Sequence, residues 1–301
     1  MKRNWGKIRR FIPMYLMLLP GLVYLFINNY MPMAGIIIAF KKYNYSLGIF
    51  TGLKNFEFLF KTKDAWTITR NTLGYNIIFI VLGTVLAIAV AILLNEIRST
   101  MGKKVYQTLI LVPFLISIVV VSYLVYGFLS TDAGFINNSI LKPMGKEAIG
   151  WYSNAKYWPF ILIFVNIWKN LGYNCIIYYA TVVGLDASLY ESASIDGANR
   201  WQRIVHITLP GLKTTIITLT LMSVGRIFYS DFGLFYQVPM NSGRLIDVTN
   251  TIDTYVYRGL MELNNIGMAS AAGLYQSLVG FALVLIANLI VRRLDENSAL
   301  F

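Results

Sequence analysis

A set of polar side chains interrupts one of the long apolar stretches of the sequence and could bind a polar solute. Asn166, Lys169, Asn170 and Asn174 recur at intervals of three and four, so a helix would place them on one face. Polar groups at membrane depth are costly and usually face a cavity or the inside of a helix bundle. We therefore expect this face to line a translocation path. The same residues could instead hold neighbouring helices together.

A second set lies in the next apolar stretch, where Arg226 and Asp231 are accompanied by aromatic residues, among them Tyr229. The two charges are five residues apart, which is not the spacing of a helical ion pair. We expect a break in the helix there, or a partner for Arg226 in another subunit. Aromatic rings beside hydrogen-bonding groups suit sugars, which stack their C–H faces on rings. An aromatic belt at the membrane surface would explain the same residues without a ligand.

The sequence lacks the motifs that several kinds of enzyme and transporter require. The sequence contains no G-x-x-x-x-G-K-[ST], no G-x-S-x-G and no H-E-x-x-H, so it predicts neither a phosphate loop nor a hydrolase motif. A single cysteine, Cys175, and a single histidine, His206, leave no disulfide and no cluster for a metal. Acidic residues are scarce in the apolar stretches, which argues against an ion-coupled carrier. We predict no catalytic residue, no metal site and no cofactor bound by this chain.

A polar island between two apolar stretches, residues 190–210, is the other candidate site. Ser188 and Glu191 have the spacing of a capping box, which predicts a short helix that begins at Ser188. Gly197 would let this helix end in a left-handed turn or approach another backbone closely. A second short helix, Trp201–Ile207, would stop before the proline that closes the island. The sequence thus predicts a helix–glycine–helix projection from the membrane.

This island resembles the EAA loop of binding-protein-dependent ABC importer permeases, whose pattern is E-A-A, three residues, G, nine residues and I-x-L-P. The matching residues are Glu191, Ala193, Gly197, Ile207, Leu209 and Pro210, while Ser192 stands at the second position of the pattern. The resemblance covers nearly the whole chain, and the segment from Trp168 to Gly172 is similar to permeases for complex oligosaccharides. It implies that the island is a coupling helix that docks on a separate ATPase. The residues expected at that contact are Glu191, Ser192, Ala193, Asp196, Gly197 and Ala198.

The resemblance also implies the rest of an assembly. Its members would be a second homologous permease, two ATP-binding subunits and an extracytoplasmic solute-binding protein, all embedded in or next to membrane lipid. ATP and Mg²⁺ would bind to the ATPase subunits. The cargo would be an oligosaccharide, and if it carries uronic acids, Lys169 and Arg226 could offset their charge. The basic residues are scattered and form no stripe, so we expect no nucleic acid partner.

Six apolar runs long enough to cross a bilayer must position these residues. Of the 301 residues, 56% are hydrophobic and 13% charged, and the mean hydropathy is +0.58, as in membrane proteins. The expected spans are Ile12–Ala39, Leu73–Leu94, Tyr106–Leu129, Trp158–Val183, Thr214–Phe235 and Met268–Val291. We predict an all-α integral membrane protein with six transmembrane helices and a cytoplasmic coupling-helix loop. In terms of the resemblance, this is a type I ABC importer permease.

Three regions are expected along the chain. Residues 1–70 would hold a basic N-terminal segment, the first span and an extracytoplasmic loop, and residues 292–301 a cytoplasmic tail. Residues 71–291 would form a five-helix permease core that includes the coupling loop, residues 186–212. The density of Lys and Arg in short loops places both termini in the cytoplasm. The first apolar run exceeds a signal-peptide core, so we expect a retained span in a multi-pass protein of the bacterial plasma membrane.

The predicted function is that of a permease subunit of an ATP-driven, binding-protein-dependent oligosaccharide importer, in which this chain forms half of the translocation path. A transporter with no ATP site and few intramembrane acids must receive its energy from a partner, and the polar island offers the contact. The alternative is an ion-coupled secondary transporter of a small solute, for which internal repeats would be expected. A membrane assembly factor without transport activity is a second alternative.

Overall fold

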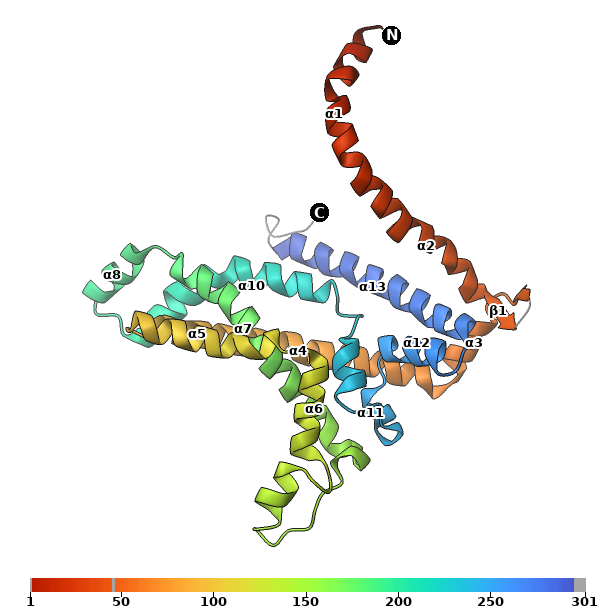
Figure 1. Cartoon of the computed structure of the whole chain (residues 1–301). Helices are drawn as coiled ribbons and strands as arrows, with labels where there is room; N and C mark the ends of the chain where they lie inside the picture. Colours follow the sequence, from red (N-terminus) through yellow and green to blue (C-terminus); the bar gives the residue numbers. More distant parts are fainter. Residues whose placement is uncertain (1, 45–46, 295–301) are drawn as a thin grey trace. The chain divides into compact units, whose positions relative to one another are not determined.

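The structure is a computed structural model that describes residues 2–44 and 47–294 (Figure 1). The chain forms two compact units, one of Met1–Thr62 with Val256–Leu274 and one of Lys63–Tyr255 with Tyr275–Phe301. Most of the expected tail, from residue 295 onward, lies outside the described residues. The expected division of the chain at residues 70 and 291 stays a prediction.

The first unit begins with a long apolar helical stretch. α1 (Lys2–Leu25) runs through Pro13 and Pro20 and continues as a π-helical turn (Phe26–Tyr30), the short α2 (Met31–Met33) and a 3-10 helix (Ala34–Phe40). Every side chain from residue 11 to residue 34 is exposed, and this stretch is long and apolar enough to cross a membrane. A helix that presents apolar side chains on all sides suits a lipid environment.

A two-stranded hairpin follows, in which β1 (Lys41–Asn44) runs antiparallel to β2 (Leu47–Phe50) and Lys41 lies opposite Phe50. α3 (Lys54–Lys61) comes next. The side-chain amide of Asn55 donates hydrogen bonds to the carbonyl oxygens of Ala39, at 2.8 Å, and Lys41, at 3.0 Å. One side chain therefore joins the end of the apolar helix to the start of the hairpin, which is the one β element in the described part of the chain.

The second unit is organised around α7 (Trp158–Val183), whose bounds are those of the predicted fourth span. α7 packs against α4 (Lys63–Glu96) and α5 (Thr100–Leu115). α7 approaches the backbone of α5 closely at Gly172, where an added Cβ would lie within van der Waals overlap of the carbonyl oxygen of Ile110. Two apolar clusters fill the contacts of α7. One consists of Tyr75, Val121, Trp158, Leu162, Val165, Leu234, Phe235, Val238 and Leu245, and the other of Ala87, Ala91, Leu94, Cys175, Tyr178, Val182 and Leu212.

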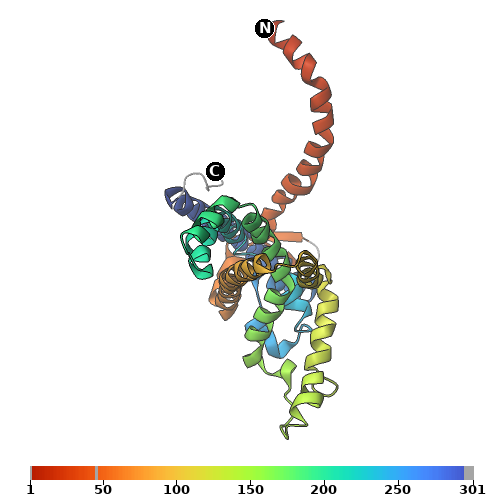
Figure 2. The ribbon, with the colours of Figure 1, turned by 90° about the vertical axis from the view of Figure 1, so that its left-hand side faces the viewer.

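The predicted third span, Tyr106–Leu129, is broken near its middle. α5 ends at Leu115, and α6 (Ile118–Leu129) leaves it at an angle of 95°. Figures 1 and 2 show this change of direction from two sides. Ser117 caps the new helix by accepting a hydrogen bond from the amide of Val120. Pro113 lies in the last turn of α5, where it removes one backbone donor.

The predicted fifth span, Thr214–Phe235, begins and ends too late. The spanning helix comprises α9 (Arg200–Arg203), a π-helical turn (Ile204–Thr208) and α10 (Leu209–Val224), in one uninterrupted path. Pro210 does not stop it, and the π-helical turn Ile204–Thr208 lies just before the proline, where a change in the hydrogen-bond pattern commonly accommodates a missing N–H. The helix ends at Val224, before Arg226, so the break lies earlier in the chain than the one expected between Arg226 and Asp231.

Apart from α8 (Ala187–Ile195), which belongs to the polar island, the remaining elements are short, with one exception. They are π-helical turns at Ile136–Leu141 and Gly233–Gln237, 3-10 helices at Trp151–Ser153, Ala155–Tyr157 and Gly243–Leu245, and the helices α11 (Ile246–Thr249) and α12 (Ile252–Met261). The exception is α13 (Ile266–Leu294), the last apolar helix. In the described residues, five helices are long and apolar enough to span a membrane, and the number is six when the bent α5–α6 pair is counted as one span. The prediction of an all-α membrane protein is confirmed, and the six predicted spans correspond to these five helices and the bent pair.

Candidate functional site

The polar island forms a projection between α7 and α10, seen at the left of Figure 1. Its first helix, α8 (Ala187–Ile195), begins one residue earlier than predicted. Asp186 caps it, since its Oδ1 accepts a hydrogen bond from the amide of Ser188 at 2.9 Å. The expected capping box of Ser188 and Glu191 is therefore wrong, because Ser188 is already inside the helix. The bond from the Ser188 amide, with one from its hydroxyl, holds the pKa of the Asp186 carboxyl below its usual value.

The far end of α8 is closed by a Schellman motif. The amide of Ala198 donates to the carbonyl of Ala193 at 2.9 Å, and the amide of Gly197 donates to Ser194 at 3.2 Å. Gly197 has a φ of +80°, which an L side chain rarely adopts. A Cβ on it would meet nothing within 4 Å in this chain, so backbone conformation alone selects glycine here. The predicted left-handed end of the helix at this residue is confirmed.

The second half of the projection begins with a capping box that the sequence analysis missed. The Asn199 amide donates to Gln202 Oε1 at 2.8 Å, and the Gln202 amide donates to Asn199 Oδ1 at 2.9 Å. The N-x-x-Q spacing was the available signal. The helix starts at Arg200 and does not stop before Pro210, which corrects the expected short helix Trp201–Ile207.

Side-chain hydrogen bonds tie the two halves of the projection together. Arg203 Nη1 donates to Ser194 Oγ at 2.9 Å, and the hydroxyls of Tyr190 and Thr208 lie 2.9 Å apart. These bonds make the projection one body. Residues of both halves enclose a pocket of about 340 Å³, which is lined by Ala193, Asp196, Gly197, Ala198, Gln202, Arg203, His206 and Ile207.

Of the six residues expected at a coupling contact, four line this pocket. The other two lie outside it on the exposed surface of α8: Glu191 is exposed, and Ser192 donates its hydroxyl to backbone carbonyls of its own helix. The sequence analysis missed two large apolar side chains at the tip. Ile195 is 86% exposed and Trp201 is 71% exposed. Apolar residues that the chain itself does not cover are typical of a contact with another protein.

The residues of the predicted polar face of α7 do not all meet the same part of the structure. The ammonium of Lys169 donates to the carbonyls of Phe114, at 3.1 Å, and of Pro113 and Ile116, at the break between α5 and α6. A cation is favoured there because the last carbonyls of a helix lack backbone donors and carry its negative pole. Lys169 thus connects two helices within this chain, which was the second of its two predicted roles.

Asn174 lies one to two turns beyond Lys169 on α7 and lines a pocket of the bundle. It lines a pocket of about 300 Å³ together with Arg226, Tyr173, Ser223 and other residues of α4, α7 and α10. Arg226 is exposed and follows the end of α10. The structure therefore brings Asn174 and Arg226 to one pocket, although they lie far apart in the sequence.

The other predicted path residues do not line that pocket. Asn170 donates its side-chain amide to the carbonyl of Asn166 at 3.0 Å, within one helix. Tyr229 is 44% exposed, and its carbonyl accepts a hydrogen bond from the side chain of Asn76 at 2.8 Å. A grouping of three or more His, Cys, Asp or Glu side chains that could hold a metal is absent from the described residues.

The bundle of apolar helices, with one bent pair and a compact polar projection, has the architecture expected of a membrane permease. Comparison with known proteins gives the family. Residues 83–296 match the model of the binding-protein-dependent transport system inner membrane component, and the chain belongs to that family. It is 35% identical over 289 residues to the polygalacturonan/rhamnogalacturonan transport system permease protein YteP of Bacillus subtilis (strain 168), covering 95% of this chain and 89% of YteP.

Other relatives agree with this assignment. Protein LplB of the same organism is 34% identical over 289 residues, covering 95% of this chain and 90% of LplB. A chain of a bacterial ABC transporter involved in the import of the acidic polysaccharide alginate superimposes with a TM-score of 0.89 at 33% identity, covering 97% of this chain and 99% of that one. A second structure of an alginate ABC transporter, in complex with an alginate pentasaccharide-bound periplasmic protein, gives a TM-score of 0.88 at 34% identity, covering 97% and 98%. The resemblance to ABC importer permeases and the predicted fold class are confirmed.

Proposed function

We propose that this chain is one transmembrane subunit of an ATP-driven oligosaccharide importer and that the projection of α8 and α9 transmits the energy. The exposed tip carries the proposal. Ile195 and Trp201 lie on either side of Gly197 and are largely uncovered by the chain itself. Burying two such side chains in a groove of a partner would stabilise a contact by a few kcal/mol, at about 1.5–3 kcal/mol each. The partner would be a separate ATP-binding subunit.

The proposed assembly contains this chain, a second homologous permease, two ATP-binding subunits with their ATP and Mg²⁺, and an extracytoplasmic solute-binding protein. The projection and both termini would face the cytoplasm of a bacterial cell, where ATP is available. Closure of the two ATP-binding subunits would move the paired projections and switch the bundle between inward and outward access. The family of the chain and the relatives that act in sugar transport support this arrangement, and nothing in the comparisons favours an ion-coupled secondary carrier.

The test is a pull-down of the tagged chain from solubilised native membranes, followed by mass spectrometry. We expect a second permease and an ATPase with the wild type. Glu191→Arg should reduce the recovered ATPase and leave the second permease bound, because it reverses a charge on the exposed surface of α8. Glu147→Arg, which changes an exposed acid in the loop between α6 and α7, is the control and should behave as wild type. Recovery of the chain alone, or equal ATPase with both variants, would reject the coupling proposal.

We also propose that the cargo is an acidic oligosaccharide, with Arg226 as the residue that offsets its charge. Arg226 is exposed in the pocket that it shares with Asn174 and Tyr173, so a cationic group, an amide and an aromatic ring lie together. Lys169 is a weaker candidate because three backbone carbonyls already accept its protons. Arg226→Gln should slow uptake of uronic-acid oligomers more than uptake of neutral ones. Equal effects on both would remove the support for an acidic cargo.

A further inference from the structure

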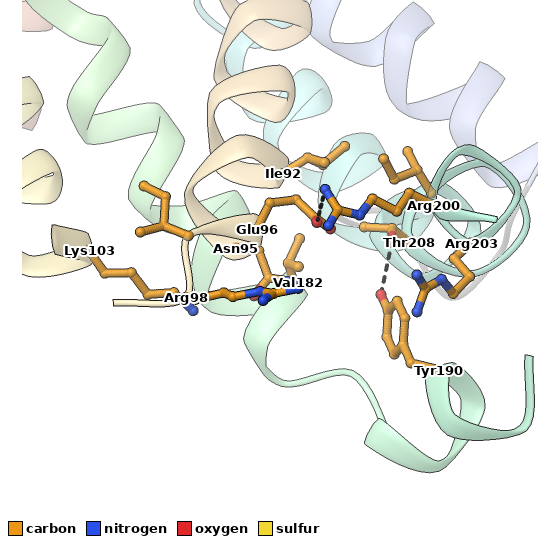
Figure 3. Close-up of a pocket in the computed structure, with 12 residues that line it drawn as sticks. Ile92, Asn95, Glu96, Arg98, Lys103, Val182, Tyr190, Arg200, Arg203 and Thr208 are labelled. Carbon is orange, nitrogen blue, oxygen red and sulfur yellow. Dashed lines mark hydrogen bonds and ion pairs between the residues drawn. The ribbon is translucent and has the colours of Figure 1, made fainter. Parts of the chain in front are cut away.

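A second pocket, of about 390 Å³, lies at the base of the projection and gathers positive charge (Figure 3). Four cationic side chains line it and one acidic side chain, Glu96, accompanies them. Arg98 comes from the turn between α4 and α5 and Lys103 from the first turn of α5, while Arg200 and Arg203 come from the start of the helix that leaves the projection. The two pairs are about a hundred residues apart in the sequence, and the packing of the helices brings them to one pocket.

Two of the four cations have partners that hold them in place. Arg200 lies 3.9 Å from a carboxylate oxygen of Glu96, and Arg203 donates to Ser194 Oγ at 2.9 Å. Within the described residues, no acid or hydrogen-bonding side chain meets the guanidinium of Arg98 or the ammonium of Lys103. In Figure 3 these two side chains extend in the same direction into the pocket, on the side away from Arg200 and Arg203. Like charges that converge on one pocket repel one another unless an anion joins them.

The walls of the pocket are partly apolar. Ile92, Ile97, Val182 and Ile204 line it beside the charges, and the hydroxyls of Tyr190 and Thr208 supply further polar groups. The pocket is formed where the spanning helices α4 and α7 end, which is the depth of the lipid headgroups in a membrane protein. An anionic phospholipid fits this combination of groups. Its phosphate would meet the cationic side chains, and its glycerol and the first part of its acyl chains would meet the apolar ones.

We propose that this pocket binds the phosphate group of an anionic phospholipid. The phosphate accepts hydrogen bonds from Arg98 and Lys103 on one side and from Arg203 on the other. The bound lipid then connects the turn between α4 and α5 to the projection and limits the motion of the projection relative to the bundle. The assignment is independent of the role of the projection in coupling and of which side of the membrane it faces.

The test uses the transporter purified through this chain in a neutral detergent. Three probes are added in turn: short-chain phosphatidylglycerol, phosphatidylcholine of the same chain length, and inorganic phosphate. Phosphatidylglycerol should raise the unfolding temperature by ligand linkage, whereas phosphatidylcholine, whose phosphate is offset by its own choline, should not. If inorganic phosphate reproduces the shift, the site takes a free phosphate; if only phosphatidylglycerol does, the lipid is the occupant. Equal shifts with the two lipids, or none with any probe, would reject the site.

Matched variants locate the effect. Arg98→Gln with Lys103→Gln should weaken phosphatidylglycerol binding by about a hundredfold, since each of the two lost charged hydrogen bonds is worth about a factor of ten. The control, Lys104→Gln with Lys213→Gln, removes the same charge from exposed residues that do not line the pocket and should bind as wild type. Glu96→Gln removes the only acid of the pocket and should tighten binding. An unchanged affinity in the first variant, or weaker binding in the last, would contradict the proposal.

Discussion

Replacement of Gly197 should loosen the tip of the projection without unfolding the membrane bundle. Its φ of +80° is costly for an L residue, by about 1–2 kcal/mol, because Cβ would approach the following carbonyl oxygen. No neighbouring atom lies within 4 Å of that Cβ, so no steric clash adds to the cost within this chain. The free energy of opening the Schellman motif should therefore fall by about 1–2 kcal/mol in Gly197→Ala and by at least as much in the β-branched Gly197→Val.

The assay is amide hydrogen exchange on the purified chain. Exchange at Ala198, whose N–H donates to Ala193, should be about 5–30 times faster in both variants, which is the population change that 1–2 kcal/mol gives. Gly197→Asn should recover most of the protection, since asparagine tolerates positive φ. In the transporter, Gly197→Val should lower the uptake per ATP hydrolysed while the amount of inserted protein stays constant.

The control is another glycine at a helix end. Gly184 follows α7 with a φ of −80°, and a Cβ on it would be 3.4 Å from the nearest atom. Gly184→Ala should thus leave exchange at the tip and uptake unchanged. The explanation fails if Gly197→Val exchanges at the wild-type rate and imports normally, or if Gly184→Ala has the same effect as Gly197→Ala.

Gly172→Ala should lower the unfolding temperature, since its Cβ would force α7 away from the backbone of Ile110 at a cost of about 1–3 kcal/mol, whereas Gly127→Ala, with open space around it, should not. Lys169→Met should destabilise the fold by about 1–3 kcal/mol, because the carbonyls at the α5–α6 break lose their donor; thermal unfolding measures this, and an unchanged midpoint would show that water replaces the ammonium. The pKa of Asp186, measured in a carboxyl NMR titration, should lie below the usual 3.8. The capping hydrogen bond should therefore be complete above pH 3.8 and should be lost as the pH falls through the lowered pKa. In Asp186→Asn the cap should persist without pH dependence.

The first and last residues of a helix could be predicted from the sequence where the capping residues and the apolar run indicate the same bounds. The bounds of α7 were correct because Trp158-Pro159 gives a helix start and Gly184 gives an end, around an unbroken apolar run. The end of α8 at Gly197 was correct for the same reason. The start of α8 was not, because Asp186 and Ser188 are both good caps two residues apart, and only the backbone conformation decides between them.

The break in the third span depends on residues that are distant in the sequence. Pro113 and Ser117 were local signals for it, but an apolar run with one proline also fits a single bent helix. The break exposes backbone carbonyls, and Lys169 of α7 is the group that satisfies them. Likewise, the pockets that contain Asn174 with Arg226, and Arg98 with Arg203, exist only once the helices have packed. Periodicity places a residue on a face but does not say what that face meets.

The uncovered tip of the projection has a consequence for how the cell makes this protein. Ile195 and Trp201 are exposed apolar side chains, and in the proposed assembly they would stay exposed on a newly inserted chain until the ATP-binding subunit covers them. Such surfaces are recognised by chaperones and proteases, which act on exposed apolar segments. A chain synthesised in excess of its partner should therefore be short-lived, and the abundance of this subunit should follow that of the protein that covers Trp201.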